Sequence, residues 1–543
     1  MLCSIMQAIP YKDKAIRSWL SYTGKAFAIL FFGLIFILLS GCTGVFAPSS
    51  KYQSDQAERV FSAGFETIQD KYIEALQPVD FALHGVENID VIDPELNVTV
   101  ANAVVHLTRG TAKVETFTTP QSGDAHGWGR FAARFIKTAR KASPLLRKAS
   151  AETIYKAVFN GALDTLDVPS RYAGLESAQD YRAKRDGFGG IGIRLNFHHA
   201  DVEIIAIMPG TPAEKSLLRA GDIITHVDNT PVKGLANRQI IQMLRGKVGT
   251  DALILVKRKG RAPLRVNLTR AHIVSQTVHL KRVGHLAIIR ITRFNHHTTR
   301  NLTRTLKRIG NHPHGIILDL RGNPGGLLDQ AVSVSDLFLK SGNIVSTRGR
   351  HPESFQLFKS TDHEMAANIP MVVLINGQSA SSSEIVATAL QDHGRAVVIG
   401  TNSYGKGTVQ NISRLPNGGE MILTWARFHT PSGYMLEQLG TMPNICTSFI
   451  EHKDIALSDP DGNRWIRAHI QKQITENIIL LSAWRTHLRF DKKSETNLRQ
   501  KCPKQTEKSG FDLKIAKYLL ENKVLYAQVL GSSMPAIAHS KTH

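Results

Sequence analysis

One stretch, residues 376–410, combines a serine cluster with a glycine-flanked lysine and limits the folds that this chain can adopt. An apolar run, residues 371–375, precedes it and predicts a short buried strand, and a second apolar run covers residues 396–399. Four apolar residues between the two runs repeat at helical spacing: Ile385, Val386, Ala389 and Leu390. The order strand, serine turn, helix, strand, lysine turn indicates an α/β core with a serine at a helix N-terminus.

This arrangement suits covalent catalysis by a serine. Helix N-termini carry unpaired N–H groups and partial positive charge, which stabilise an oxyanion. A serine is a poor nucleophile until a base takes its proton, and Lys406 is the nearest candidate base. Lys406 has to be neutral to act, and burial lowers the pKa of a lysine from its ordinary value of about 10.4. On composition alone the nucleophile remains open among the serines of the cluster, which are Ser379, Ser381, Ser382 and Ser383.

The same residues also permit other interpretations. Ser381 and Glu384 form the pattern of a capping box, which explains the serine structurally and is compatible with a catalytic role. Residues 400–406 nearly match a phosphate-binding loop, but Gly407 stands where that motif needs Ser or Thr. No Gly-x-Ser-x-Gly elbow occurs in the cluster, which disfavours an α/β-hydrolase.

The stretch resembles the C-terminal processing peptidases, also called tail-specific proteases. The family pattern Ser-Ala-Ser-Glu-Ile matches residues 381–385, with Ser382 where alanine is usual, and Gly-Lys-Gly with a following Gln matches Lys406 and Gln410. The resemblance implies that Ser381 is the nucleophile, that Lys406 is the general base and that Gln410 orients the lysine. It also implies that the catalysis needs no metal and no other cofactor.

A second motif, residues 319–326, is similar to the family's Asp-Leu-Arg-x-Asn-Pro-Gly-Gly sequence. Glycines after a buried strand let backbone N–H groups point at a ligand. The resemblance implies that an amide at Gly325 or Gly326 joins the amide of Ser382 as the oxyanion hole, and the choice between the two glycines stays open. We expect Asp319 and Arg321 to form a structural ion pair.

Residues 187–268 resemble a PDZ domain, with a glycine-rich opening and an Ala-Gly-Asp-Ile-Ile string at residues 220–224. A PDZ domain binds an extended C-terminal peptide as an added strand. The opening loop would bind the terminal carboxylate, and the helix at residues 236–244 would form the other wall of the groove. The residues expected to bind the peptide are Gly189, Gly190, Ile191, Gly192, Ile240 and Leu244.

The N-terminus predicts export and membrane attachment. Basic residues precede an apolar run at residues 26–39, which ends in Leu-Ser-Gly-Cys and resembles a bacterial lipoprotein signal with Cys42 as the lipidated residue. An uncleaved membrane anchor is the alternative. We therefore expect the protein on the periplasmic side of a bacterial membrane. The net charge of +22 is spread along the chain without a nucleic-acid motif, so the expected partners are anionic lipid or cell-wall polymer, and no nucleic acid.

The cysteine count supports the same compartment. Four cysteines occur, and removing the signal and acylating Cys42 leaves Cys446 and Cys502. An even pair in an oxidising compartment predicts a Cys446–Cys502 disulfide, with two unpaired buried thiols as the alternative. No Cys/His cluster has the spacing of a metal site.

The expected fold is α/β (α+β), with a mixed-sheet peptidase core, an inserted PDZ domain and an N-terminal helical region. Residues 167–172 resemble the Asp-Pro-His-Ser-Arg-Tyr string of the family's N-terminal region, and residues 119–129 are predicted as a loop. A helix is predicted over residues 512–530. The predicted divisions are a lipoprotein-type signal (1–42), a mostly helical region with an unassigned insert (43–182), a PDZ domain (183–272), a catalytic core (273–448) and a helical extension (449–543).

The predicted function is an extracytoplasmic serine endopeptidase that cleaves proteins near their C-termini. Its expected substrates are proteins or peptides with free C-termini. Its lipid anchor is expected to bind the membrane. An adaptor protein and a homo-oligomer are also compatible with the resemblance. The alternatives are a PDZ scaffold or adaptor on an inactive peptidase fold, and a basic cell-wall-associated protein. Intact Ser381, Lys406 and Gln410 argue against the scaffold.

Overall fold

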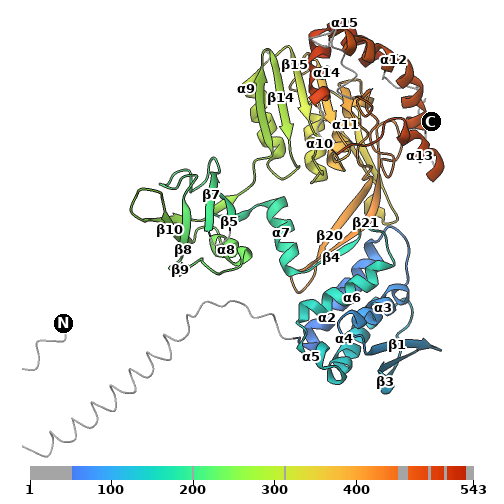
Figure 1. Cartoon of the computed structure of the whole chain (residues 1–543). Coiled ribbons are helices and arrows are strands. Elements are labelled where there is room, and N and C mark those ends of the chain that lie inside the picture. The colour runs from blue at the N-terminus through green and yellow to red at the C-terminus, as the bar shows by residue number, and fades with distance from the viewer. Residues whose placement is uncertain are drawn as a thin grey trace, which may run out of the picture.

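The computed structural model describes residues 52–198, 201–310, 313–450, 463–486, 491–506 and 510–532. The predicted signal segment with Cys42 lies outside these residues. In the described part of the chain, no helix combines the length and the apolar character that crossing a membrane requires. Figure 1 shows the chain passing from an N-terminal helical region through a small β-rich unit to a mixed sheet, with the last helices packed against that sheet.

The N-terminal region is a helical bundle with a small antiparallel sheet beside it. Apolar residues at helical spacing on α2, including Phe61, Phe65 and Ile68, are fully buried in the bundle core. The sheet has the strand order β1-β2-β3 and forms part of the insert that the sequence left unassigned. The elements are α2 (Ser54–Lys71), α3 (Pro78–Glu87), η2 (Asn88–Val91), β1 (Leu96–Ala101), β2 (Val104–Arg109), β3 (Ala112–Thr118), α4 (Ala125–Ala142), α5 (Pro144–Lys148) and α6 (Ala151–Asp164).

Helix α4 begins earlier than the sequence predicted. It starts at Ala125, capped by Asp124, whose Oδ1 accepts a hydrogen bond from the Gly127 N–H at 2.7 Å. The loop prediction for residues 119–129 was therefore wrong over its last five residues. The glycines there permit close helix packing, because a Cβ on Gly129 would lie 2.3 Å from Ser62 Oγ on α2.

The next unit is a sheet with the strand order β11-β10-β8-β7-β6, packed on α8 around its own apolar core. Strand β5 pairs with β12, so the chain enters and leaves the unit at one place. The elements are α7 (Leu175–Asp186), β5 (Phe188–Gly190), β6 (Ile193–His198), β7 (Asp201–Ile207), β8 (Ile223–Val227), β9 (Thr230–Pro231), α8 (Asn237–Leu244), β10 (Asp251–Lys257), β11 (Leu264–Thr269) and β12 (Ala271–Ile273).

The core sheet has the strand order β13-β14-β15-β18-β19-β22, antiparallel between β13 and β14 and parallel from β14 onward. Because parallel strands end at one edge, the loops after β15, β18 and β19 lie together. These loops contain residues 320–326, 376–381 and 401–407. The elements are β13 (Val278–Val283), β14 (Leu286–Ile291), α9 (Thr298–Ile309), β15 (Gly315–Asp319), α10 (Leu328–Asp336), β18 (Met371–Ile375), α11 (Ser382–Asp392), β19 (Val397–Gly400) and β22 (Ile445–Cys446).

A second sheet, with the order β17-β16-β21-β20, adjoins the core. Strand β4 of the N-terminal region pairs with β21, so this sheet links the helical bundle to the core. Its elements are β4 (Arg171–Ala173), β16 (Asn343–Arg348), η3 (Pro352–Ser354), β17 (Gln356–Lys359), β20 (Thr408–Arg414) and β21 (Glu420–His429).

The C-terminal helices cover the face of the core sheet opposite to α9, α10 and α11. Side chains of β15 alternate between the two layers, with Ile316 and Leu318 on one face and Ile317 on the other. The predicted helix over residues 512–530 is divided at Asn522, whose side chain donates to the Tyr518 carbonyl oxygen. The elements are α12 (Asn463–Thr486), α13 (Lys492–Gln500), α14 (Gly510–Glu521) and α15 (Lys523–Ser532).

Candidate active site

Ser381, Lys406 and Gln410 line one pocket of about 310 Å³ at the edge where β15, β18 and β19 end. Ser381 follows β18, Lys406 follows β19 and Gln410 lies on β20. Further walls come from residues 324–328 and from α7 of the linker to the PDZ-like unit. The structure thus brings together, from separate elements, the residues that the sequence predicted as catalytic.

Ser381 is the N-cap residue of α11 and has a φ of 55°. A positive φ costs a non-glycine residue roughly 1–3 kcal/mol, and it persists only where the surroundings impose it. The turn is held from outside, because the Ala380 N–H donates to the Asn323 carbonyl oxygen at 3.0 Å. The Ser381 hydroxyl caps no amide of the first helical turn. Its position therefore presents the hydroxyl to the pocket rather than to the helix.

The neighbouring serines of the cluster are engaged elsewhere. Ser379, Ser382 and Ser383 donate their hydroxyl protons to main-chain carbonyl oxygens of residues 320–326, at 2.9, 3.1 and 2.9 Å. Among the described residues, the Ser381 hydroxyl has no such acceptor. The geometry therefore favours Ser381 among the serines that composition left open.

Glu384 joins the serine turn to the lysine turn. Its fully buried carboxylate accepts hydrogen bonds from the N–H groups of Ser381 and Lys406 at 2.6 and 3.0 Å on Oε2. On Oε1 it accepts bonds from Ser403 Oγ at 2.5 Å and from the Gly405 N–H at 2.6 Å. Burial raises the pKa of the Glu384 carboxyl, and these hydrogen bonds act in the opposite sense. The capping-box hydrogen bond is thus one of four hydrogen bonds that the Glu384 carboxylate accepts.

Lys406 sits in a turn that requires its flanking glycines. Gly405 has a φ of 90°, and a Cβ on Gly407 would lie 1.9 Å from the Glu437 amide nitrogen. Burial lowers the pKa of Lys406, and the positive charge of Arg171 lowers it further, while Glu384 acts to raise it. The net direction is downward, which favours the neutral amine that a general base needs.

Gln410 is oriented by a chain of hydrogen bonds from the N-terminal region. Thr424 Oγ1 donates to Asp167 Oδ2 at 2.5 Å, and Gln410 Nε2 donates to Thr424 Oγ1 at 2.8 Å. Because the threonine proton goes to Asp167, the threonine oxygen has to accept from the amide nitrogen of Gln410. The Gln410 Oε1 atom is then turned the other way, and it is buried without a hydrogen-bond partner among the described residues.

The backbone around Ser381 distinguishes the two glycines. The Gly325 N–H donates to Asn323 Oδ1 at 2.9 Å, so this donor is occupied. In the described part of the chain, neither the Gly326 N–H nor the Ser382 N–H is engaged, and both residues line the pocket with Ser381. Gly325 is needed for close approach, since a Cβ there would lie 2.8 Å from Ser381 Cβ. The free N–H groups favour Gly326 over Gly325 as the second oxyanion donor.

The PDZ-like unit has a groove of about 200 Å³ beside its glycine-rich opening. Gly190, Ile191, Gly192 and Leu244 line it, as the sequence predicted. Gly189 does not line this groove: it pairs with β12 and its carbonyl oxygen accepts from the Gly246 N–H at 3.0 Å.

Ile240 was wrongly predicted as a groove residue. It is 2% exposed and packs into the core of the unit, while Ile241 and Arg245 line the groove. Ile240 and Leu244 are four residues apart and share the inner face of α8, and Leu244 reaches the groove from the end of the helix. Ile241 therefore faces the groove at the position that was expected of Ile240.

Two predicted structural features, an ion pair and a disulfide, are present in the fold. Asp319 and Arg321 form a buried ion pair, with Arg321 Nε 2.9 Å from Asp319 Oδ1. Cys446 and Cys502 are joined in a disulfide with their Cα atoms 5.9 Å apart. Cys42 lies outside the described residues. Among the residues that the structure describes, no group of three or more His, Cys, Asp or Glu side chains is arranged to hold a metal ion.

Sequence reasoning missed the wider roles of Glu384, Asp167 and Thr424. Glu384 carried a signal, but its capping-box spacing accounted for only one of its hydrogen bonds. Asp167 belongs to a string that resembles the family pattern, and this was the available indication that it matters. Thr424 lies 257 residues from Asp167 and carries no local signal.

Comparison with known proteins yields two matching family models, Peptidase family S41 over residues 285–447 and PDZ domain over residues 189–268. The carboxy-terminal-processing protease of Bartonella bacilliformis is 38% identical over 301 residues, which is 54% of this chain and 69% of that protein. The solved photosystem II D1 C-terminal processing protease is 21% identical, with a TM-score of 0.38, and the match covers 74% of this chain and 94% of that one. The PDZ domain of a carboxy-terminal protease from Vibrio cholerae, solved with a peptide, is 26% identical with a TM-score of 0.15, over 16% of this chain and 96% of that one.

Proposed function

The chain belongs to peptidase family S41 as a carboxy-terminal-processing protease with a PDZ domain, and from this premise we propose that it cleaves peptide bonds with a Ser381/Lys406 dyad. The observation that carries the assignment is the Ser381 hydroxyl, which has no hydrogen-bond partner among the described residues and lies in the same pocket as a partly buried lysine. The lowered pKa of Lys406 supports its role as the base, because burial and Arg171 disfavour the ammonium form.

The reaction follows from these positions. Neutral Lys406 takes the proton of the Ser381 hydroxyl as Oγ attacks the carbonyl carbon of the scissile bond. The tetrahedral intermediate collapses, and the lysine ammonium gives its proton to the leaving amine, which departs as the new N-terminus. A water molecule then loses a proton to Lys406 and attacks the acyl-enzyme, and the proton returns to Ser381 as the acid product leaves.

The oxyanion of each intermediate would be bound by the N–H groups of Ser382 and Gly326. In the described part of the chain these two N–H groups have no other acceptor, which supports the assignment, as does the positive end of α11 at Ser382. Gln410 Oε1 would accept a hydrogen bond from Lys406 Nζ and hold the amine towards Ser381. The support for this step is the buried, unpartnered Oε1 atom and the fixed orientation of the amide.

The groove of the PDZ domain would bind the C-terminus of the substrate. The carbonyl oxygens of Ile191 and Gly192 accept from the Met208–Ala213 segment, with Ala213 N donating to Ile191 and Met208 N to Gly192, each at 2.9 Å. Among the described residues, the N–H groups of Ile191 and Gly192 have no acceptor, and they would bind the terminal carboxylate. A charge-assisted hydrogen bond contributes about 1.5–3 kcal/mol, so a C-terminal amide should slow cleavage by about ten- to hundredfold. Equal cleavage rates for free-acid and amidated peptides would contradict the proposal that the groove binds the C-terminus of the substrate.

We further propose that the protein works outside the cytoplasm, on the periplasmic side of a bacterial membrane and tethered through a lipid on Cys42. The support is the sequence of residues 12–42, in which basic residues, an apolar run and Leu-Ser-Gly-Cys follow one another. Fractionation of cells that express the full chain, with protease protection of intact spheroplasts, tests this placement. A protein that is protected inside spheroplasts would contradict it.

The dyad is tested on the protein that begins at residue 43. A fluorophosphonate probe should label one serine, and mass spectrometry of the labelled peptide should identify Ser381 rather than the neighbouring serines. Ser381→Ala and Lys406→Ala should each lower kcat by several orders of magnitude, and the double variant should lose little more, because the groups act as a unit. Lys406→Arg should also be inactive, since arginine stays protonated. An active Lys406→Arg enzyme would overturn the assignment of the base.

A further inference from the structure

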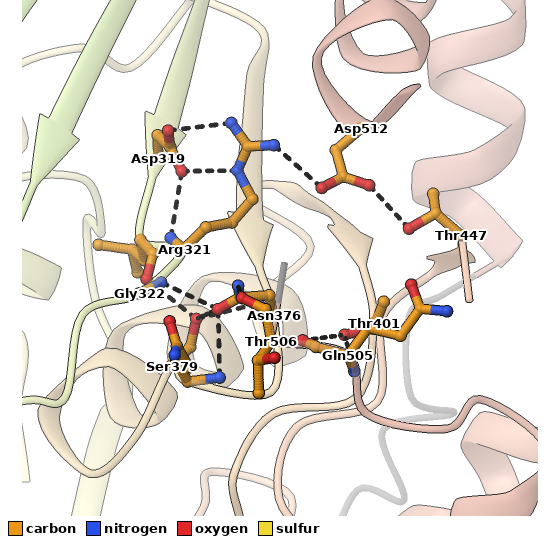
Figure 2. A network of polar contacts seen from close by, with 12 residues as sticks. Asp319, Arg321, Gly322, Asn376, Ser379, Thr401, Thr447, Gln505, Thr506 and Asp512 are labelled. Atoms are coloured by element: carbon orange, nitrogen blue, oxygen red, sulfur yellow. Dashed lines mark hydrogen bonds and ion pairs between the residues drawn. The ribbon is translucent and has the colours of Figure 1, made fainter. Parts of the chain in front are cut away.

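The contacts of the C-terminal extension with the loops that surround Ser381 include those made by residues 502–506 and by Asp512. Both lie beyond residues 285–447, which match the peptidase family model. We infer that these residues, called here the C-terminal brace, are positioning residues that hold the oxyanion loop and the serine turn in their catalytic geometry. The inference rests on the proposed Ser381 chemistry and concerns how its geometry is maintained (Figure 2).

Asp512 is attached to the oxyanion loop through Arg321. Arg321 ends the segment after β15 and directly precedes Gly322, the first glycine of the loop. Its guanidinium binds Asp319 at 2.9 Å and Asp512 Oδ2 at 3.0 Å, while Asp512 Oδ1 accepts from Thr447 Oγ1 at 2.7 Å. All three charged residues are buried, at most 7% exposed. Arg321 is therefore held between its own strand and a helix of the extension, as Figure 2 shows.

Residues 505 and 506 are attached to the serine turn through main-chain groups. Asn376 begins this turn: its Oδ1 accepts from the Gly322 N–H at 2.9 Å, and its Nδ2 donates to the Thr506 carbonyl oxygen at 2.9 Å. The Gly377 N–H donates to the Gln505 carbonyl oxygen at 2.7 Å. One buried asparagine thus links the oxyanion loop, the serine turn and the brace.

The contact with Gln505 excludes a side chain on the serine turn. A Cβ at residue 377 would lie 2.9 Å from the Gln505 carbonyl oxygen, so glycine is needed for the approach. The Gln505 N–H also donates to Thr401 Oγ1 at 3.1 Å, in the loop that leads to Lys406. The brace therefore reaches the loops after β15, β18 and β19 together.

The start of the brace is covalently fixed to the core sheet. Cys502 forms the disulfide with Cys446 at the end of β22, and Ser448 Oγ donates to the Pro503 carbonyl oxygen at 2.5 Å. Reduction by dithiothreitol would take two electrons from the reagent, which closes to its cyclic disulfide, and would leave two thiols on the protein. The brace would then be held only by its hydrogen bonds and by the ion pair between Asp512 and Arg321, so activity should fall on reduction while the sheet stays folded.

Contacts between the brace and the catalytic loops should affect the catalytic rate rather than substrate binding. Oxyanion donors work only when they are already aimed at the developing charge, and loss of one donor costs roughly 10²–10³ in kcat. A shift of about 1 Å caused by a distant substitution can cost about 10²-fold. Loosening of the loop at Gly322 or of the turn at Asn376 should therefore lower kcat and leave KM nearly unchanged.

The test compares Asp512→Ala, which removes the contacts to Arg321 and Thr447, with Asp512→Asn, which retains an acceptor. We expect Asp512→Ala to lower kcat about ten- to hundredfold with KM changed less than about threefold, and Asp512→Asn to restore part of the loss. The affinity for a peptide boronate, which mimics the tetrahedral intermediate, should fall in proportion to kcat.

Arg485→Ala is the matched control. It breaks the buried pair between Arg485 and Asp392, at 2.9 Å, which also attaches the extension to the core. Asp392 is at the far end of α11, about 16 Å along the helix axis from Ser381. We expect a similar loss of thermal stability in both alanine variants but a fall in kcat only in Asp512→Ala.

Two results would overturn the inference. One is an Asp512→Ala enzyme with lower thermal stability and unchanged kcat and boronate affinity, which would make the brace structural only. The other is an equal fall of kcat in Arg485→Ala. Failure of the proposed chemistry is separate, because the wild-type protein would then show no probe label on Ser381, whatever Asp512 does.

Discussion

Replacing Glu384 by glutamine tests whether one carboxylate connects Ser381 to Lys406, the proposed nucleophile and its proposed base. The two oxygens of Glu384 accept from two donors each, namely the amides of Ser381 and Lys406 on one side and Ser403 Oγ and the Gly405 amide on the other. A glutamine has one oxygen and presents N–H groups at the other position. At best one pair of donors keeps its acceptor, and the other pair faces the amide nitrogen.

The expected loss of stability follows from the unsatisfied donors. A buried donor without an acceptor costs about 1–3 kcal/mol, so two such donors predict a loss of about 2–6 kcal/mol in the free energy of unfolding. Urea denaturation of the protein that begins at residue 43 measures this loss. Glu437→Gln is the control: Glu437 accepts from Arg427 Nε at 2.5 Å, and the amide oxygen can retain that bond. Its free energy of unfolding should stay within about 0.5 kcal/mol of the parent.

The pH profile supplies a readout that a general loss of stability would not change. Glu384 acts to raise the pKa of Lys406, so Glu384→Gln should lower that pKa further. The rising limb of kcat/KM against pH, which reports deprotonation of Lys406, should therefore move to lower pH even as kcat falls. The reasoning is refuted by a Glu384→Gln enzyme whose rising limb stays in place and whose free energy of unfolding equals that of Glu437→Gln.

Further expectations concern the base, the cysteines and the groove. Since the pKa of Lys406 is lowered below its ordinary 10.5 in the folded state, the unfolded chain binds more protons between the two values and stability rises with pH there. Lys406→Met should thus be more stable than the parent near neutral pH in urea denaturation, with a gain that shrinks towards pH 10.5; a constant gain would contradict this. Thiol titration of the unfolded protein from residue 43 should find no free thiol, because Cys446 and Cys502 are paired, and two free thiols would remove the disulfide. Cys42→Ser should abolish metabolic lipid labelling and leave the precursor unprocessed, whereas a wild type without lipid would indicate a plain signal helix. Ile241→Asp should slow cleavage of free-acid peptides without reducing probe labelling of Ser381, and unchanged peptide cleavage would exclude this groove as the substrate site.

The local parts of the site were predictable because short-range patterns encode them. Strand, serine turn, helix, strand and lysine turn follow one another within residues 371–407, so their order alone places Ser381 and Lys406 at the same sheet edge. The choice between Gly325 and Gly326 was not predictable. It depends on the Asn323 side chain, which occupies the Gly325 amide through a turn that the sequence does not reveal.

The sequence also did not determine which face of the short amphipathic helix α8 packs against the core. Ile240, Ile241 and Leu244 are all apolar, and the pattern permits either isoleucine to face the core. The sheet packed beneath α8 decides the matter, since Ile240 is buried in the core around β8 and β10. The brace residues were missed for a related reason: Asp512 reaches Arg321 across 191 residues, and no local spacing connects the two.

The string at residues 167–172 shows how a region outside the catalytic core enters the chemistry. Strand β4 pairs Tyr172 with Met421 on β21, and β21 also pairs with β20, which carries Gln410. This pairing brings Asp167 to Thr424, and so fixes the amide of Gln410.

The same string contains Arg171. Burial makes the largest contribution to the lowered pKa of Lys406, and the positive charge of Arg171 lowers it further. Burial raises the pKa of the Glu384 carboxyl, whereas its four hydrogen-bond donors favour the ionised form, and the negative charge of that form acts to raise the pKa of Lys406. This opposition is limited, because Arg171 lowers the pKa of Lys406 by more than Glu384 raises it. Pairing of β4 with β21 therefore places a second contribution, beside burial, that lowers the pKa of Lys406.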